Sequence, residues 1–329
     1  MSSMLNNKPL TIKMPTHNVI DVTLRDGGFR NNFNWAQSES NSIYEACCAA
    51  GTEWIELGYI GGLPAIHSAD GYGKFADLKP ADIIKLAPRK SGCHQSRLAV
   101  MVHPSAKGTA VGYDEFKDAG VELVRVVYHP SWEQSAFLAN KKAKDAGLMT
   151  AINIALVSRY DKNHLAEISQ VILNEQPNIL YFADTCGALE PNDVLKLFQS
   201  HCSEIETGFH AHDFLSLAVA NSLSAIRAGC KWIDISLLGM GRGAGNTRAE
   251  TWIALRERAG QNAIPTSQIL KATKCIEKNS GTAKIPDLVS IISGARNLTP
   301  LQEDEIRENL EILTNSYCPS SLTTKLGKT

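Results

Sequence analysis

Short apolar runs rich in β-branched residues alternate along this chain with longer segments in which apolar residues recur every three or four positions. The short runs predict strands, and the longer segments predict amphipathic helices. Two of the latter, "SNSIYEACCAAG" and "AFLANKKAKDAG", end on a glycine, the residue expected at a helix C-cap. The strand-like runs number eight: 19–24, 54–60, 98–103, 123–129, 150–157, 179–184, 205–212 and 232–239.

The number and spacing of these alternations favour a (β/α)8 TIM barrel, because eight strand–helix units occupy roughly 240 residues, the usual length of that fold. An open, doubly wound sheet also alternates strands and helices. It is disfavoured because the count is eight and no G-x-G-x-x-G follows the first strand. The sequence therefore predicts an N-terminal extension at 1–18, a catalytic TIM barrel at 19–250 and a C-terminal extension at 251–329.

The C-terminal extension is predicted to be helical, with four amphipathic segments. It is regarded as an extension of the barrel because no Pro/Gly/Ser-rich linker precedes it. The last residues, "CPSSLTTKLGKT", are expected to be a frayed tail. The four segments are "AETWIALRERAG", "TSQILKATKCIEKN", "IPDLVSIISGAR" and "LQEDEIRENLEILTNS".

Composition narrows the possible functions. A chain of 329 residues that is 43% hydrophobic and 20% charged has the composition of an ordinary globular protein. The 33 basic and 34 acidic residues nearly cancel, and no basic tract with interleaved aromatics is present, so no nucleic-acid partner is expected. No apolar run reaches the ~18 residues of a membrane span, and the N-terminus lacks a signal-peptide core, so a cytoplasmic protein is expected. The eight cysteines form no C-x-x-C pair, which favours free buried thiols.

Polar and ionisable residues gather at the carboxyl ends of the predicted strands. In a TIM barrel these ends supply the catalytic groups. Burying such groups without partners would cost several kcal/mol each, so a shared site explains them best. The strand ends carry Arg25, Asp26, Glu56, His103, Tyr128, His129, Asn153, Asp184, Thr185, His210 and His212, and the loop "GMGRGAGN" (239–246) follows the eighth strand.

The pair His210 and His212 predicts a metal site. Strand residues two apart point to the same side, so the two imidazoles project together. A divalent ion needs further ligands, preferably a carboxylate for Mg or Mn. Asp26, at the end of the first strand, would lie next to the seventh and eighth strands once the barrel closes. Asp26, His210 and His212 are the predicted metal ligands, and Asn246 is predicted to hydrogen-bond near the metal or to ligate it.

Four motifs resemble those of one enzyme family, the DRE-TIM metallolyases, also called the HMG-CoA-lyase-like superfamily of (β/α)8 enzymes. The motifs occur in the family's order between about residues 19 and 260. Within the family the chain is most similar to the 4-hydroxy-2-oxovalerate aldolases, through "RVVYH" (125–129) and "ADTCGAL" (183–189). HMG-CoA lyase is disfavoured because its glycine loop carries a cysteine and "GMGRGAGNT" has none. The four motifs are "TLRDGG" (23–28), "FADTCGAL" (182–189), "GFHAHDFLSLAVANSLSAIRAGC" (208–230) and "LLGMGRGAGNTRAE" (237–250).

The resemblance implies that Asp26, His210 and His212 hold a divalent cation, with Mn or Mg expected first and Co or Zn as alternatives. It also implies that Arg25 binds the carbonyl and enolate oxygens of the substrate. Cleaving a carbon–carbon bond next to a carbonyl passes through an enolate, whose negative oxygen needs a Lewis acid and a fixed cation. A guanidinium suits this role because it can grip the 2-oxo and carboxylate oxygens together.

Three further residues are candidates for substrate binding or for positioning the catalytic groups. Thr185 either hydrogen-bonds the substrate carboxylate or caps the helix that follows it. Glu56 either orients Arg25 or His129, or forms an ion pair inside the barrel. Asn153 is a weaker candidate for substrate binding.

The chain also departs from the aldolase pattern at two acid/base positions. Those aldolases have a histidine just after R-D-G, where this chain reads "GFRNN" (28–32). They also bring a tyrosine from the C-terminal helices, where "IPDLVSIISGARNLTP" has none. The remaining acid/base candidates are His129, Tyr128, His67 or a metal-bound water. His129 is favoured because histidine titrates near neutral pH.

The sequence therefore predicts a metal-dependent aldolase that acts through a pyruvate-type enolate on a 4-hydroxy-2-oxoacid, with small oxoacid and aldehyde ligands. The alternative is an acyl-CoA-dependent Claisen-type synthase of the isopropylmalate or homocitrate kind, which shares "H-x-H-D-x-x-x-L-A-V-A-N-S". Residues 251–329 look too short for the regulatory domain that such synthases often carry. A barrel that binds metal without catalysis is a third possibility. By analogy a homodimer is expected, whereas the diverged extension argues against an aldehyde dehydrogenase partner.

Overall fold

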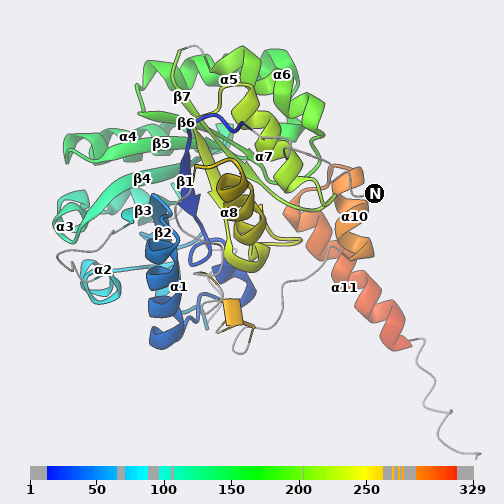
Figure 1. Ribbon diagram of the computed structural model, residues 1–329, viewed down its shortest axis with the longest axis horizontal. Coiled ribbons are helices and arrows are strands. Elements are labelled where there is room, and N and C mark those ends of the chain that lie inside the picture. Colours follow the sequence, from blue (N-terminus) through cyan, green and yellow to red (C-terminus); the bar gives the residue numbers. More distant parts are fainter. Residues whose placement is uncertain are drawn as a thin grey trace, which may run out of the picture.

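The eight predicted strands form one closed parallel barrel in the order β1 to β8, with β1 paired to both β2 and β8 (Figure 1). The prediction of a (β/α)8 barrel is confirmed. The strands are β1 Asn18–Asp21, β2 Trp54–Ile60, β3 Arg97–Val102, β4 Val121–Tyr128, β5 Met149–Ile154, β6 Ile179–Asp184, β7 Glu206–Ala211 and β8 Trp232–Ile235. The computed structural model describes residues 13–64, 71–87, 96–104, 107–202, 204–261, 269, 273–274, 276–277 and 287–316.

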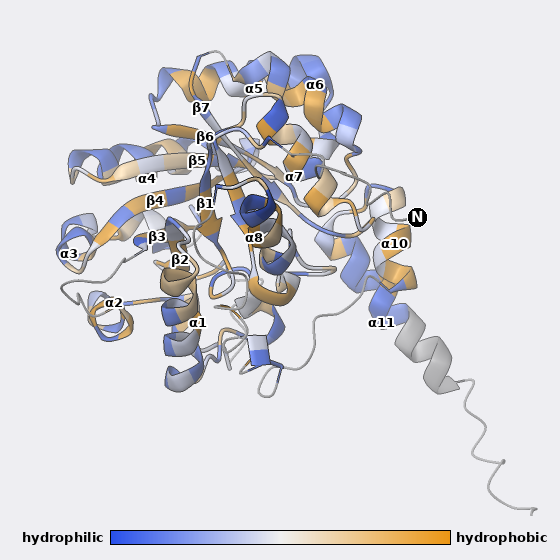
Figure 2. Ribbon diagram, in the orientation of Figure 1, coloured by the Kyte–Doolittle hydropathy of each residue, from blue (hydrophilic) through white to orange (hydrophobic). Residues whose placement is uncertain are grey.

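Helices between the strands surround the barrel and bury their apolar faces against it. Apolar and hydrophilic residues alternate along these outer helices (Figure 2). In α5, for example, Leu165, Ile168 and Ile172 are buried at helical spacing, and Asp161 caps the first turn by accepting from two backbone N–H groups. The helices are α1 Gln37–Ala49, α2 Pro80–Leu86, α3 Tyr113–Asp118, α4 Glu133–Asp145, α5 Lys162–Asn174, α6 Pro191–His201, α7 Ala218–Arg227 and α8 Ala249–Arg258.

Side chains that point into the barrel change from apolar to charged along its axis. The amino-terminal half is filled by a separate apolar cluster that includes Ile20, Trp54, Leu123 and Trp232. Two residues further along their strands, Glu56, Arg125 and Asp234 point into the same interior and are buried. The apolar layer therefore closes the bottom of the barrel, and a polar layer lies beneath its carboxyl-terminal opening.

The first and last strands end earlier than the apolar runs predict. The Asp21 carboxylate accepts a hydrogen bond from the backbone N–H of Thr23, and the Thr23 hydroxyl accepts one from that of Leu237. These side-chain bonds replace ladder bonds and turn both segments out of the sheet. Because β1 ends at Asp21, the residues after it form turns that carry Arg25 and Asp26 over the opening.

The C-terminal helices α10 (Leu288–Ala295) and α11 (Pro300–Ser316) lie to one side of the barrel, in orange and red in Figure 1. Thr299 precedes α11, and its backbone N–H donates to the Gln302 side chain at 2.8 Å. Two of the four predicted helical segments are confirmed here, and α8 is a third. Most of the segment at 266–279, the tail from 317 onward and His67 lie outside the described residues.

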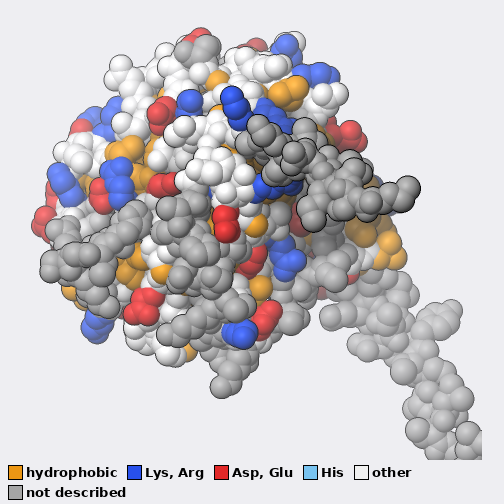
Figure 3. All heavy atoms as spheres, viewed as in Figure 1, with side chains coloured by type: hydrophobic (Ala, Val, Ile, Leu, Met, Phe, Trp, Pro, Cys, Tyr) orange, Lys and Arg blue, Asp and Glu red, His pale blue; other side chains and the backbone are white. Residues whose placement is uncertain are grey.

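The surface and the cysteines match an ordinary globular protein. Charged side chains of both signs are interspersed over the face shown in Figure 3. The five described cysteines are free thiols: Cys47, Cys48, Cys186, Cys202 and Cys230. Within the described part of the chain, no helix is both long and apolar enough to span a bilayer.

Candidate metal centre and active site

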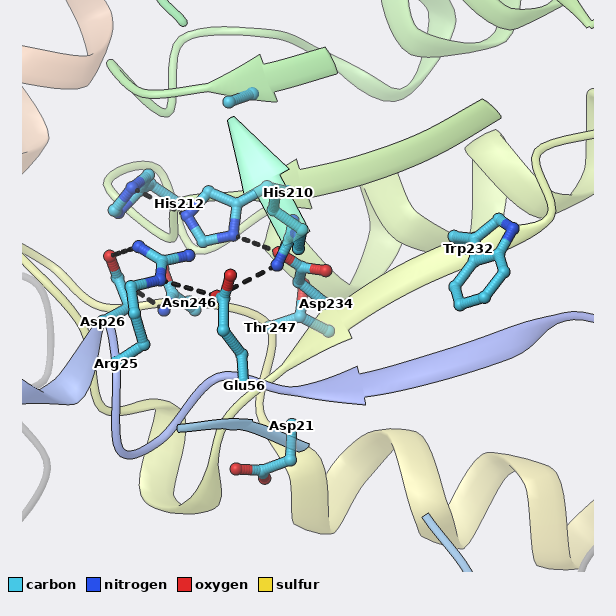
Figure 4. Close-up of polar contacts among 12 residues, drawn as sticks. Asp21, Arg25, Asp26, Glu56, His210, His212, Trp232, Asp234, Asn246 and Thr247 are labelled. Atoms are coloured by element: carbon cyan, nitrogen blue, oxygen red, sulfur yellow. Dashed lines mark hydrogen bonds and ion pairs between the residues drawn. The ribbon is translucent and has the colours of Figure 1, made fainter. Parts of the chain in front are cut away.

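The three predicted metal ligands come together at the carboxyl end of the barrel, where they form a buried cluster. One potential ligand atom from each of Asp26, His210 and His212 lies within 4.8 Å of the other two. The Nε2 atoms of the two imidazoles are 3.2 Å apart, so both rings point to the same place (Figure 4). The alternation of β7 sets this arrangement, because Ala211 between them faces away from the interior.

The orientation of His210 and the protonation of His212 suit metal binding. The Nδ1 of His210 lies 2.8 Å from an Asp234 carboxylate oxygen, which can only accept, so Nδ1 donates and Nε2 is the atom directed at the cluster. Burial is the main reason that the pKa of His212 is lowered to about 3, and the nearby carboxylate of Asp26 does not offset it. His212 is therefore a neutral imidazole at neutral pH, the form that ligates metals.

The glycine loop after β8 hydrogen-bonds to the carboxylate of Asp26. One carboxylate oxygen of Asp26 accepts from the backbone N–H of Arg242 at 3.2 Å and from the Asn246 side-chain amide at 2.7 Å. A Cβ on Gly241 would lie 2.6 Å from that oxygen, so only glycine lets the loop approach this closely. The Asn246 amide oxygen is buried without a hydrogen-bond partner among the described residues.

A chain of buried ion pairs supports the cluster from below. Arg25 pairs with Asp26 and donates through Nε to Glu56 at 2.7 Å. Arg125 then links Glu56, at 3.0 Å, to Asp234, at 2.7 Å. Burial alone would raise the pKa of Asp26, but Arg25 and the two imidazoles outweigh it and hold that pKa well below its usual range.

The charge balance and donor set of this cluster fit a divalent cation. Its two guanidiniums face three carboxylates, which leaves one negative charge in excess in a buried site. Two imidazoles, one carboxylate and an unsatisfied amide oxygen form a mixed nitrogen and oxygen donor set of the kind that divalent metals accept. The residues present therefore fit such a metal.

The cluster opens into a cavity of about 330 Å³. Its walls are mostly apolar, with polar side chains from the cluster and from several other strand ends, and residues at and just before the start of α11 complete the lining. A polar group at one end of an apolar cavity orients a small organic ligand. The lining includes Arg25, Asp26, Phe29, Tyr59, Leu63, Met101, His103, Val127, Trp132, Asn153, Ala183, Thr185, His210, His212, Arg242, Thr299 and Leu301.

Comparison with known proteins places this geometry in a family. The family model for HMGL-like proteins matches residues 17–276, most of the chain. The chain belongs to the HMGL-like family. This confirms the family assignment and the prediction of an enzyme that were made from the motifs.

Relatives of this HMGL-like chain are carbon–carbon lyases by name. A 4-hydroxy-2-oxovalerate aldolase of Geobacillus genomosp. 3 is 30% identical over 78% of this chain and 76% of its own length. One of Thermus thermophilus is 28% identical over 77% of this chain and 71% of its own. Among solved structures, the N-terminal domain of a putative aldolase from Bacteroides vulgatus superposes with a TM-score of 0.74 at 22% identity, covering 91% of this chain and 99% of that one. At that identity the superposition speaks for the fold alone.

Of the other predicted site residues of this HMGL-like enzyme, two line the cavity and one lies beneath it. Thr185 and Asn153 line the cavity. The Thr185 hydroxyl accepts from the Leu156 backbone N–H at 3.0 Å, whereas the side-chain oxygen Oδ1 of Asn153 has no partner among the described residues. Glu56 is fully buried below the cavity and orients Arg25.

The predicted acid/base residue, His129, does not line the cavity. Its Nδ1 accepts from the Ser131 backbone N–H at 3.1 Å, and its ring packs on Trp132. His103, just after β3, does line the cavity and packs on the same tryptophan, with 4.5 Å between the ring centroids. Tyr128 points toward α4, where its hydroxyl donates to Glu133 at 2.8 Å. Asp184 also faces outward and accepts from two backbone N–H groups.

Sequence reasoning missed three residues of the site. Arg125 and Asp234 complete the buried ion pairs, and Tyr59 lines the cavity. A signal was present for the first two, because each is a charged residue at an inward position of an apolar strand, in "LVRVV" and "WIDIS". Tyr59 gave no such signal, because an aromatic residue in an apolar strand is ordinary.

Proposed function

We propose that this protein is a divalent-metal-dependent aldolase that cleaves a 4-hydroxy-2-oxoacid into pyruvate and an aldehyde. The observation that carries the proposal is the buried cluster of Asp26, His210 and His212 beside Arg25, facing a cavity for a small ligand. The relatives named 4-hydroxy-2-oxovalerate aldolase support the same reaction class. Mn or Mg is the proposed ion, with Co or Zn as alternatives.

The ion would be held by Asp26, His210 and His212, with Asn246 beside them, and would supply Lewis-acid stabilisation of the enolate oxygen. Arg25 binds the 2-oxo and carboxylate oxygens of the substrate. Glu56 and Asp26 fix its guanidinium before the substrate arrives, so little reorganisation is needed as negative charge develops. Asn153 and Thr185 contribute polar groups from the ends of β5 and β6, across the barrel opening from Arg25.

Cleavage also requires removal of the proton from the C4 hydroxyl and delivery of a proton to C3 of the enolate. His103 lines the cavity, and histidine is the residue type that exchanges protons near neutral pH, so we assign the proton transfer to it in preference to His129. Tyr59 keeps its proton at neutral pH, since burial raises its pKa to about 12, and acts as a hydrogen-bond donor.

The first test is exchange of the pyruvate methyl protons in D2O, followed by NMR with and without added Mn or Mg. Enolate formation predicts metal-dependent exchange. Asp26→Asn and Arg25→Ala are expected to lower the exchange rate by at least about a hundredfold, the usual effect of removing one stabilising group. The matched control is Asp145→Asn, which removes a carboxylate that is 62% exposed on α4.

Equal exchange in the wild type and in both site variants would contradict the proposal. If the wild type shows no exchange although metal binds, a second assay with pantetheine thioesters decides between an acyl-transferring synthase and a barrel without catalysis. Turnover of a thioester would replace the aldolase assignment, and no turnover of either substrate class would support the non-catalytic barrel.

A further inference from the structure

A second cavity of about 260 Å³ adjoins the metal-bearing cavity. The two share Phe29 and Arg242 in their linings, so these two side chains border both cavities. The walls of this second cavity are polar, in contrast to the apolar walls of the first. Its lining residues are Phe29, Arg30, Tyr72, Arg242, Gly243, Glu303, Asp304 and Arg307.

Two of its three guanidiniums already have carboxylate partners. Arg307 is bound by Asp287 and Glu303 through several hydrogen bonds. Arg242 pairs with Asp304 at 3.0 Å, but the Asp304 side chain is 56% exposed. An exposed pair of this kind contributes little, so an incoming anion can replace it at small cost.

The third guanidinium, that of Arg30, differs from those of Arg242 and Arg307. Arg30 is half-buried, and burial lowers the pKa of its guanidinium. Within the described part of the chain it has neither a hydrogen bond nor an ion pair. A partly desolvated cation without a partner is unfavourable, and it becomes favourable when a ligand supplies the negative charge.

The loop that carries Arg30 is closely packed. The ring of Phe33 is fully buried, and a Cβ on Gly28 would lie 2.3 Å from it. Asn32 and Phe33 both adopt left-handed backbone conformations, with φ of 52° and 60°. Side chains rarely accept such φ values, so the surrounding packing holds the loop backbone in this conformation and sets the point at which the Arg30 side chain leaves it.

We propose that this second cavity binds an anionic group at the far end of the aldehyde portion of the substrate, with Arg30 as the main contact and Arg242 beside it. The inference rests on the proposed aldolase function. It specifies the substrate class as an aldehyde with a terminal carboxylate or phosphate, in place of a plain alkyl aldehyde. Both groups accept the paired N–H donors of a guanidinium.

The experiment measures aldol addition of pyruvate to matched aldehydes. In this direction C3 of pyruvate loses a proton and bonds to the aldehyde carbon, whose oxygen gains a proton. Propanal is compared with succinic semialdehyde, and glyceraldehyde with glyceraldehyde 3-phosphate. The wild type is expected to favour the charged member of at least one pair by about tenfold to a hundredfold in kcat/KM. The carboxylate and phosphate arms show which group is bound.

The decisive quantity is the charged-to-neutral ratio of kcat/KM in Arg30→Gln. It is expected to fall to near one. Lys85→Gln, which removes a cation from an exposed position of α2, is expected to keep the wild-type ratio. Thermal unfolding of each variant shows whether it is folded. A wild type without preference, or a folded Arg30→Gln that retains the preference, would overturn the inference.

A second measurement separates this inference from the proposed function. Pyruvate exchange in D2O tests the function alone. If exchange is absent, binding of inorganic phosphate by calorimetry still tests the second cavity. Weaker binding by about tenfold in Arg30→Gln but not in Lys85→Gln supports an anion site, whereas equal binding in all three proteins contradicts it.

Discussion

At the scale of single residues, two imidazoles at neighbouring strand ends have different surroundings. His103 and His129 both contact Trp132, but only His103 lines the metal-bearing cavity. We expect His103→Gln to lower the rate of aldol cleavage by about a hundredfold or more, because proton transfer by a placed side chain contributes that much. His129→Gln is expected to stay within about threefold of the wild type. Steady-state kinetics with Mn present measures both.

Metal affinity is the internal control for the His103→Gln and His129→Gln variants. Metal affinity, measured by calorimetry, is expected to be unchanged in both, since neither histidine belongs to the predicted ligand set. A larger loss in His129→Gln than in His103→Gln would show that the assignment of the proton transfer is reversed.

The ligand set could be predicted from the sequence because it depends on short-range rules. Two strand residues with one residue between them point to the same face, and closure of the barrel brings the end of β1 close to β7 and β8. Which imidazole faces the substrate could not be predicted in this way. That choice depends on how His129 leaves β4, where its ring accepts a backbone hydrogen bond from Ser131.

At the scale of elements, the two loops over the barrel opening depend on close backbone approach. Gly241 is the clearest case, since a Cβ there would lie 2.4 Å from the Asn246 amide and 2.6 Å from an Asp26 oxygen. Gly241→Ala is therefore expected to displace Asp26 and to weaken binding of Mn by about tenfold to a hundredfold, the range seen when groups that orient ligands are changed.

Calorimetric titration with Mn provides the measurement for Gly241→Ala, and Gly112→Ala provides its control. A Cβ at Gly112 meets nothing within 4 Å, and this residue, before α3, has φ of −88°, which alanine accepts. If Gly241→Ala binds Mn as tightly as the wild type does, Asp26 is not positioned by the glycine loop.

The positions of the elements were largely predictable, but their ends at the opening were not. Apolar runs identify all eight strands because each buries a continuous stretch. The runs at 19–24 and 232–239 continue past the sheet because the turns after β1 and β8 are also buried and apolar. Side-chain bonds of Asp21 and Thr23 end those strands, and such bonds leave no trace in an apolar pattern.

At the scale of the whole molecule, the packing of helices around the barrel places two acidic groups where burial opposes their ionisation. Burial raises the pKa of both Asp21 and Asp184 to about 6, although each carboxylate accepts backbone hydrogen bonds. Both residues point outward from strand ends, toward the helices. The fold is therefore expected to be destabilised by ionisation of these two groups as pH rises, in addition to the acid sensitivity of paired carboxylates such as Asp26.

The contribution of Asp21 can be isolated by comparing the wild type with Asp21→Asn at several pH values. A carboxyl whose pKa is about 6 in the folded state and 3.8 when unfolded binds more protons folded, so its stabilising effect is complete below pH 3.8 and is lost as pH rises through 6. The full loss is about 3 kcal/mol, of which about 1.4 kcal/mol falls between pH 5 and pH 8.

The asparagine side chain of the variant does not ionise, and its amide oxygen can still accept from the Thr23 N–H. Urea unfolding is therefore expected to show Asp21→Asn gaining about 1.4 kcal/mol relative to the wild type over that interval, while ionisation of Asp26 and Asp184 cancels between the two proteins. A constant difference from pH 5 to pH 8 would mean that Asp21 is already ionised in the folded protein at pH 5, and that the thiol of Cys47 and the Thr23 N–H stabilise its charge more than burial disfavours it.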